Sequence, residues 1–153
     1  MEIRRATRKD FLAIAALDRE AWAGNRHSEF IPDGEHVWRI WVDHAVVWCA
    51  AEGDTVAGVV LAFPSTSGAY CLHKAFVHRA YRGQGLGSRL FEALLAEIDR
   101  LDTDVFLTVD PVNEAAIALY ERWGFRERQF EAGFYRANED RLVLTRRAGR
   151  GEP

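Results

Sequence analysis

A glycine-rich segment between residues 77 and 88 has the composition of an anion-binding loop. It reads Val-His-Arg-Ala-Tyr-Arg-Gly-Gln-Gly-Leu-Gly-Ser, with glycines at 83, 85 and 87. Glycine lets a backbone turn sharply and lets its N–H groups approach a ligand without a Cβ in the way. Together with the N–H groups of a following first helical turn, such a loop forms a concave site for an anion, and a pyrophosphate suits it.

Two different phosphate-binding motifs do not fit this segment. A Rossmann fingerprint needs a glycine three positions after Gly85, where Ser88 stands. A Walker loop needs a Gly-Lys-Ser/Thr run, which the segment does not contain. The pattern that fits is Arg-x-x-Gly-x-Gly, from Arg82 to Gly87, and the simpler interpretation is a glycine turn that binds nothing.

A second set of candidate residues follows about thirty positions later in the sequence. Asn113, Ala116 and Tyr120 are spaced at i, i+3 and i+7, which places them on one face of a helix. Tyr120 could equally be a core aromatic beside Leu119. Asn113 could be a helix N-cap, and that role is compatible with ligand binding.

The two motifs in this order resemble the signature of the GNAT superfamily of N-acetyltransferases. The second reads Asn-x-x-Ala-x-x-Leu-Tyr-x-x-x-Gly-Phe, and the resemblance covers residues 70–125. It implies that the glycine loop cradles the pyrophosphate of coenzyme A, while the pantetheine arm passes Ala116 and bonds to Asn113. The cofactor-binding residues that it implies are Phe76, Val77, Arg82, Gly83, Gln84, Gly85, Leu86, Gly87, Ser88, Asn113, Ala116 and Tyr120.

The same resemblance implies a reaction. A primary amine attacks acetyl-CoA directly in a ternary complex, an N–H near Phe76 and Val77 polarises the acetyl carbonyl, and Tyr120 gives its proton to the departing thiolate. No metal is expected. The competing hypothesis is an acyl-CoA-binding sensor module without turnover, since a fold does not guarantee activity.

The general base is less well defined by the sequence. Several GNAT members carry a glutamate where this chain has Thr108, which cannot accept the proton. Asp110 lies two residues further on but precedes Pro111, where it can simply cap a turn. His73 on the earlier strand has an ordinary pKa near ~6.5, which suits a base. A buried structural role for His73, and a chain of water molecules in place of a side-chain base, are equally open.

Hydrophobic periodicity predicts the elements that position these residues. Thr7 is the predicted N-cap of the first helix, with Asp10 as its capping-box partner. The predicted strands are 2–6, 45–51, 55–63, 70–77, 105–109, 125–130 and 141–144, and the predicted helices are 7–22, 35–42, 86–101 and 113–122, the last closed by Gly124. We therefore expect an α/β GNAT fold, with a mixed, mostly antiparallel sheet of about six to seven strands flanked by about four helices.

Composition bounds the remaining properties. The 153 residues carry a net charge of −3, which argues against a nucleic-acid partner, and no apolar run is long enough for a membrane. Cys49 and Cys71 lie in predicted strands and suit a reducing compartment, so we expect a cytoplasmic protein. Residues 1–147 are expected to form one domain, with 148–153 as a flexible tail and a homodimer as a possible assembly.

The acceptor is expected opposite coenzyme A, between residues 23–34, the second helix and a loop at 131–139. Acidic and aromatic side chains occur together in these segments, which fits a cationic amine. They are Glu29, Asp33, Glu35, Glu131, Phe30, Trp38, Phe134 and Tyr135.

Overall fold

The computed structural model describes residues 1–30 and 32–149. Its elements are, in order, β1 (Glu2–Arg5), α1 (Phe11–Trp22), α2 (Glu35–His44), β2 (Val46–Glu52), β3 (Thr55–Pro64), β4 (Tyr70–Val77), the short 3₁₀ helix η1 (Arg79–Tyr81), α3 (Leu86–Leu101), β5 (Val105–Val109), α4 (Glu114–Arg122), β6 (Glu127–Arg136) and β7 (Glu139–Arg146). The described strands follow the order β1-β2-β3-β4-β5-β7-β6 in one sheet. The pairing of β4 with β5 is parallel, whereas β1 with β2, β2 with β3, β5 with β7 and β6 with β7 are antiparallel.

The chain divides into two compact units, and the division falls within β4. Unit 1 comprises residues 1–63 and 74–97, and unit 2 comprises residues 64–73 and those from 98 onward. The predicted tail lies largely outside the described residues, which end at Gly149. Before that point, the Ala148 N–H donates to the Asp104 carboxylate at 2.7 Å.

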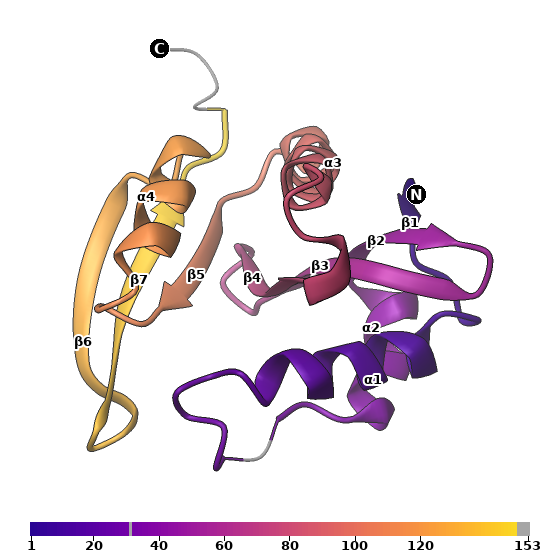
Figure 1. The fold of residues 1–153 in the computed structure, drawn as a ribbon. Coiled ribbons are helices and arrows are strands. Elements are labelled where there is room, and N and C mark those ends of the chain that lie inside the picture. Colours follow the sequence, from indigo (N-terminus) through magenta and orange to yellow (C-terminus); the bar gives the residue numbers. More distant parts are fainter. Residues whose placement is uncertain (31, 150–153) are drawn as a thin grey trace. The chain divides into compact units, whose positions relative to one another are not determined.

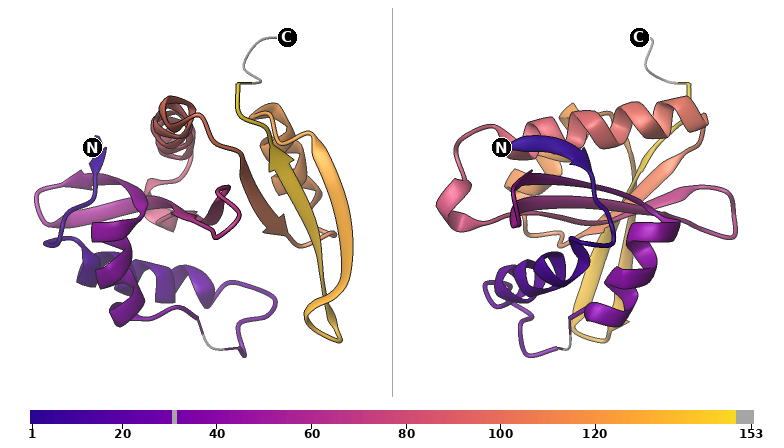
Figure 2. Two further views of the ribbon diagram at one scale, coloured as in Figure 1. Left: turned by 180° about the vertical axis from the view of Figure 1, so that it is seen from behind. Right: turned by 90° about the vertical axis from the view of Figure 1, so that its right-hand side faces the viewer.

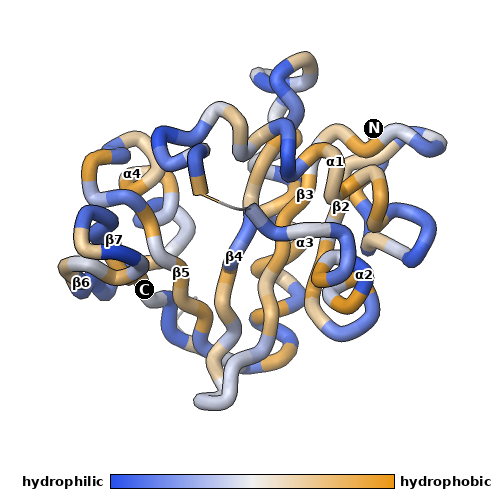
Figure 3. The backbone as a smooth tube through the Cα atoms, turned by 90° about the horizontal axis from the view of Figure 1, so that it is seen from below, coloured by the Kyte–Doolittle hydropathy of each residue, from blue (hydrophilic) through white to orange (hydrophobic). Residues whose placement is uncertain are grey.

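In unit 1, helices cover both faces of the sheet formed by β1, β2 and β3 (Figure 1). One face packs with α1 and α2 in a single apolar cluster that includes Ile14, Trp38, Val47, Cys49 and Leu61. On the other face, the indole N–H of Trp48 donates to Glu97 of α3 at 3.2 Å. A Cβ added to Gly58 of β3 would lie 3.0 Å from Leu90 of α3. Burial on both faces explains the continuous apolar run of β3, which Figure 3 shows in the hydrophobic colour.

The start of α1 differs from the prediction. Asp10, not Thr7, is the N-cap, and its side chain makes no capping bond to the helix. The Asp10 carboxylate instead accepts from the Thr7 N–H at 2.7 Å and from both terminal nitrogens of Arg4 at 2.8 and 3.0 Å. The guanidinium of Arg4 holds the pKa of Asp10 below its usual value. The bond that the capping box predicts from the Thr7 N–H to Asp10 therefore forms, but the Thr7 hydroxyl donates to the same carboxylate at 3.1 Å, and the ion pair with Arg4 links this carboxylate to β1.

In unit 2, β5, β7 and β6 lie side by side, with α4 on one face (Figure 2). Ile117 of α4, Phe125, Leu107 and Leu144 are all buried. Gly124 follows the C-cap residue Trp123, as the sequence predicts. Strand β6 is mostly exposed along its length.

The predicted loop at 131–139 is wrong. Strand β6 continues to Arg136 and β7 begins at Glu139, so this segment is the tip of a long hairpin. The register is irregular between Glu131 and Arg136. Gly133 and the polar residues around it are typical of a turn, so they predict a loop. The strand that contains them lacks the alternation of apolar and polar residues by which a strand is identified in a sequence.

Candidate functional site

The glycine loop of unit 1 joins the end of β4 to α3 through η1. Gly83 and Gly85 have φ angles of +77° and +76°, a conformation that most residues adopt only with strain. A Cβ added at either position would meet no protein atom within 4 Å. The backbone conformation therefore requires glycine at these positions, while packing does not, and the loop backbone stays open to a ligand.

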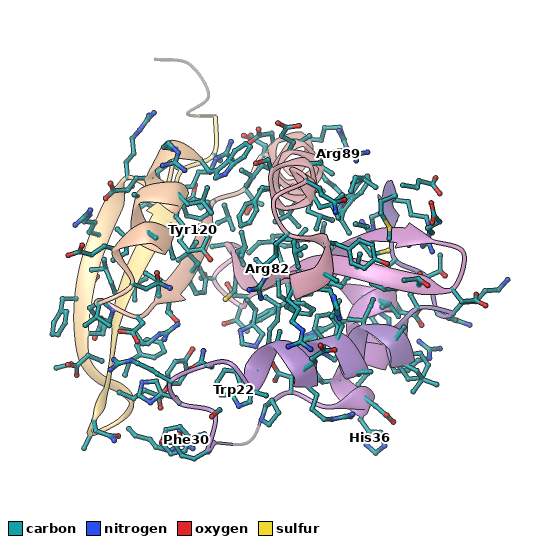
Figure 4. The ribbon with its side chains drawn as sticks, viewed as in Figure 1. Trp22, Phe30, His36, Arg82, Arg89 and Tyr120 are labelled. Carbon is teal, nitrogen blue, oxygen red and sulfur yellow. The ribbon has the colours of Figure 1, made fainter. Side chains whose placement is uncertain are left out.

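The charge around this loop is positive although the whole chain is negative. Residues 77–91 contain Arg79, Arg82 and Arg89 and neither Asp nor Glu. All three arginines are exposed, and the first turn of α3 carries no acidic residue. Figure 4 shows Arg82 and Arg89 in the region of α3. Because a helix N-terminus also attracts anions, the segment suits a phosphate group.

Two side chains at the start of the loop form contacts that no sequence pattern predicts. His78 accepts from the Ala80 N–H through Nδ1 at 3.0 Å and so caps η1, while its Nε2 lies 3.3 Å from Glu20. The Nε–H of Arg82 donates to the Val77 carbonyl at 3.1 Å. A single histidine at a strand end has no motif, which is why its capping role was missed.

On α4 of unit 2, the predicted N-cap role of Asn113 is confirmed. Its side-chain oxygen accepts from the Ala116 N–H at 3.2 Å. Asn113 is exposed, Ala116 and Tyr120 are half-buried, and their helical spacing puts them on one side of α4. A ligand that follows this side would meet one amide, one small residue and one phenol.

The ring of Tyr120 packs edge-on against Phe125, with 6.0 Å between the ring centres. Burial raises the pKa of Tyr120 above the ordinary phenol value of 10.0, and the positive charge of Arg141 partly opposes that effect. The phenol is therefore protonated at neutral pH, as a proton donor must be.

Thr108 and Asp110, at the end of β5, both form hydrogen bonds within the protein. Thr108 accepts from the Nε–H of Arg141 at 3.1 Å and lies 3.2 Å from the Tyr135 hydroxyl. Asp110 accepts from the Val112 N–H at 3.1 Å, which matches the predicted turn cap. His73, on β4, is exposed, so the hypothesis of a buried structural histidine is wrong.

The acidic side chains of unit 1 that are predicted to surround the acceptor are partly neutralised. Lys74 of β4 lies 3.1 Å from Asp18 and 3.1 Å from Asp33, with its ammonium 5.4 Å from the ring centre of Trp22. Trp38 is fully buried, and its indole N–H donates to Asp18 at 2.9 Å. Asp33 and Trp38 therefore bind to other residues of the protein. The sequence could not show this, because Asp18 and Asp33 are both far from Lys74 along the chain.

The loop that follows α1 is also fixed from inside unit 1. The indole N–H of Trp22 donates to the Phe30 carbonyl at 2.9 Å, and Figure 4 shows the two side chains in this region. The ring of Phe30 stacks on His27 at 5.8 Å. Glu29 and Glu35 remain exposed.

Replacing Lys74 with Met is expected to lower the free energy of unfolding by about 3–5 kcal/mol, because it leaves the buried Asp18 carboxylate without its cation. The Lys74 side chain is 12% exposed and that of Asp18 is 3% exposed. Urea unfolding followed by tryptophan fluorescence measures the loss.

Arg19→Met is the control, because Arg19 pairs with Glu35 at 3.9 Å on the surface, where an ion pair contributes little. Adding Asp18→Asn to the Lys74→Met variant should recover part of the stability. A Lys74→Met protein as stable as the control would contradict a stabilising role for this ion pair.

Both cysteines are free and buried, Cys49 in β2 and Cys71 in β4, and burial raises the pKa of each thiol to about 11. Across residues 1–30 and 32–149, no three His, Cys, Asp or Glu side chains are grouped so that they could hold a metal ion. Within the same residues, every helix is too short or too polar to cross a membrane.

Comparison with protein families finds a match to the acetyltransferase (GNAT) family over residues 11–125. The [ribosomal protein bS18]-alanine N-acetyltransferase of Escherichia coli K12 is 39% identical over 62 residues, which are 40% of this chain and 42% of that protein. The matched segment thus spans less than half the length of this curated relative.

Solved structures resemble the chain over nearly its whole length. The ribosomal-protein-alanine N-acetyltransferase of Brucella melitensis gives a TM-score of 0.79 at 22% identity, covering 95% of this chain and 99% of that one. The PaiA N-acetyltransferase of Thermoplasma acidophilum, solved in complex with coenzyme A, gives 0.68 at 14% identity, covering 95% and 98%. These similarities confirm the predicted α/β fold with its mostly antiparallel seven-stranded sheet.

Proposed function

The chain belongs to the acetyltransferase (GNAT) family, and we propose from this that it transfers an acetyl group from acetyl-CoA to a primary amine. The observation that carries the proposal is the loop from Arg82 to Ser88. It combines two glycines of positive φ, an accessible backbone, exposed arginines and a helix N-terminus, which together fit a pyrophosphate. The α-amine of a protein N-terminus is one acceptor to test, since the named relatives are ribosomal-protein-alanine N-acetyltransferases.

We assign the following roles to the remaining site residues. N–H groups of Arg82 to Ser88 bind the pyrophosphate, the backbone at Phe76 and Val77 pairs with pantetheine, and one N–H there polarises the acetyl carbonyl. Asn113 bonds to the pantetheine amides, and Ala116 leaves room for the arm. These roles follow the family resemblance. They are compatible with the cap on α4, which uses the side-chain oxygen of Asn113, and with the small side chain of Ala116.

The reaction balances with one acid and one base. The amine nitrogen forms a bond to the carbonyl carbon, the carbon–sulfur bond breaks, and Tyr120 gives its proton to the thiolate. The amine releases one proton to His73 or to ordered water. Asp110 is less suited to this task, because its carboxylate caps a turn. The raised pKa of Tyr120 supports its role as the acid.

Residues 1–147 form, in this proposal, one catalytic domain, because the family match runs through both units. A cytoplasmic location is supported by the two buried free thiols. Support for a cationic acceptor is weakened, since Asp33 pairs with Lys74 and Glu35 with Arg19, which leaves Glu29 and Glu131 of the four predicted acidic residues. A homodimer stays a prediction, which light scattering would check.

Two measurements test the proposed function. Thermal shifts with acetyl-CoA, ATP and NAD show which ligand stabilises the protein, and acetyl-CoA alone is expected to raise the melting temperature. Release of free thiol is then followed for a panel of amines. Stabilisation by acetyl-CoA with no thiol release from any amine would favour the sensor module instead, and stabilisation by ATP or NAD alone would contradict coenzyme A binding.

A further inference from the structure

Arg141 of unit 2 is held in a fixed orientation by groups that carry no negative charge. Its Nε–H donates to the Thr108 hydroxyl at 3.1 Å and a terminal N–H donates to the Thr108 carbonyl at 2.8 Å. The guanidinium carbon lies 5.4 Å from the ring centre of Tyr135, whose hydroxyl lies 3.2 Å from the same Thr108 side chain. Three neutral groups thus orient a half-buried cation.

This arrangement differs from that of four other arginines of unit 2. Arg128, Arg136, Arg146 and Arg147 of unit 2 each pair with a carboxylate. Among residues 1–30 and 32–149, by contrast, no carboxylate lies within ion-pair distance of Arg141. Even Glu131, its partner in the β6–β7 register, accepts a hydrogen bond from Gln129 instead. A guanidinium can form stronger, charge-assisted bonds to a carboxylate than to the neutral groups that hold Arg141, so this environment suits an anionic ligand.

The place of Arg141 connects it to the proposed chemistry. In the β5–β7 pairing, Thr108 is opposite Val143, and Arg141 lies two residues from Val143 on the same face of the strand. The charge of Arg141 also acts on Tyr120, the proposed acid. Arg141 is therefore close to residues that would surround the reacting groups.

We propose that Arg141 binds a carboxylate of the acceptor, so that the substrate is a primary amine with a carboxylate a few bonds away. The inference rests on the proposed acetyltransferase function. A free amino acid and a peptide with an acidic residue next to its N-terminus both supply this chemistry. A guanidinium forms charge-assisted, often bidentate bonds to a carboxylate, whereas it repels an ammonium group.

The same charge has a second consequence. A cation near an amine favours the neutral form of that amine, which is the nucleophilic form. Arg141 would thereby raise the fraction of acceptor amine that is ready to react. Acidic residues around the amine would favour its ammonium form, whereas Arg141 favours the neutral form. A weaker proton acceptor, such as His73 or ordered water, is then sufficient.

Matched acceptor pairs test the inference. One pair is alanine and alaninamide, and the other is Ala-Asp-Ala amide and Ala-Asn-Ala amide; the two pairs distinguish a free amino acid from an acidic peptide. In at least one pair we expect the carboxylate member to have a kcat/KM about 10- to 100-fold higher per neutral amine, the effect of one charge-assisted hydrogen bond. Values are compared per neutral amine because a nearby carboxylate raises the pKa of the amine. The difference should lie mainly in KM for the acceptor, with KM for acetyl-CoA unchanged.

Variants separate recognition from a structural role. Arg141→Met should reduce the preference to about onefold, and Arg141→Lys should retain part of it, since a single ammonium keeps the charge without the planar fork. Arg128→Met is the matched control, because Arg128 pairs with Glu121 on the surface of the same unit, and it should leave the preference unchanged. A structural role alone would lower the activity toward both members of a pair equally.

Two results would overturn the inference. A wild-type enzyme that acetylates both members of each pair equally has no carboxylate subsite, and an Arg141→Met variant that keeps the preference places the subsite elsewhere. If only uncharged or cationic amines are acetylated, the inference fails while the proposed function stands. If no amine is acetylated although acetyl-CoA binds, both fail.

Discussion

Tyr120→Phe is expected to lower kcat by about 100-fold, the usual contribution of a positioned acid, while KM for acetyl-CoA changes little. The phenol is the group on α4 that can donate a proton, and burial raises its pKa, so that it is protonated at neutral pH. Phenylalanine keeps the packing against Phe125 and removes only the hydroxyl. Steady-state kinetics with the best amine of the panel measure the effect.

The pH dependence provides a second readout of the same role. An acid must be protonated to act, so activity in the wild type should fall as the pH rises through the elevated pKa of Tyr120. The Tyr120→Phe variant should lack this alkaline decline. Tyr70→Phe on β4 is the control, since its hydroxyl has no assigned role, and it should retain wild-type turnover. Unchanged turnover in Tyr120→Phe would remove the phenol from the mechanism.

Gly85→Ala is expected to weaken acetyl-CoA binding by about 100-fold or more, on the order of the loss of several phosphate contacts. A Cβ at this position meets no protein atom within 4 Å, so protein packing tolerates the methyl group, and a loss of affinity would come from its contact with the bound pyrophosphate. A side chain also disfavours the φ of +76°, and relaxation of that angle would turn the following N–H away. Isothermal titration calorimetry measures the affinity.

Gly53→Ala is a matched control for this substitution. Gly53 lies in the turn between β2 and β3 with a φ of +60°, and a Cβ there also meets nothing within 4 Å. Both variants should lose about 1–2 kcal/mol of stability from the left-handed conformation. Only Gly85→Ala should lose affinity for acetyl-CoA. Equal affinities in the two variants would mean that the loop does not contact the pyrophosphate.

The parts of the fold that follow local patterns could be predicted from the sequence. The bounds of β4, α3 and β5 agree with the prediction, because apolar periodicity and flanking turn residues define them. The N-cap role of Asn113 followed from its position before an apolar helical stretch. The predicted strand 125–130 ends before β6 does, because β6 is mostly exposed and lacks the alternation that identifies a strand.

The parts that depend on charges brought together by folding could not be predicted. Asp10 keeps its bond to the Thr7 N–H but also pairs with Arg4, and Asp33 is paired with Lys74, far away in the sequence. The surroundings of Arg141 combine residues from β5, β6 and β7. No spacing rule connects such residues, so their roles emerge only from the structure.

The most direct test of the central claim is a crystal structure of the protein with acetyl-CoA bound. We expect pyrophosphate oxygens within about 3 Å of backbone nitrogens between Gly83 and Ser88, and the thioester sulfur within hydrogen-bond reach of the Tyr120 hydroxyl. A structure in which acetyl-CoA binds away from this loop, or in which the sulfur and that hydroxyl are far apart, would contradict the proposed mechanism.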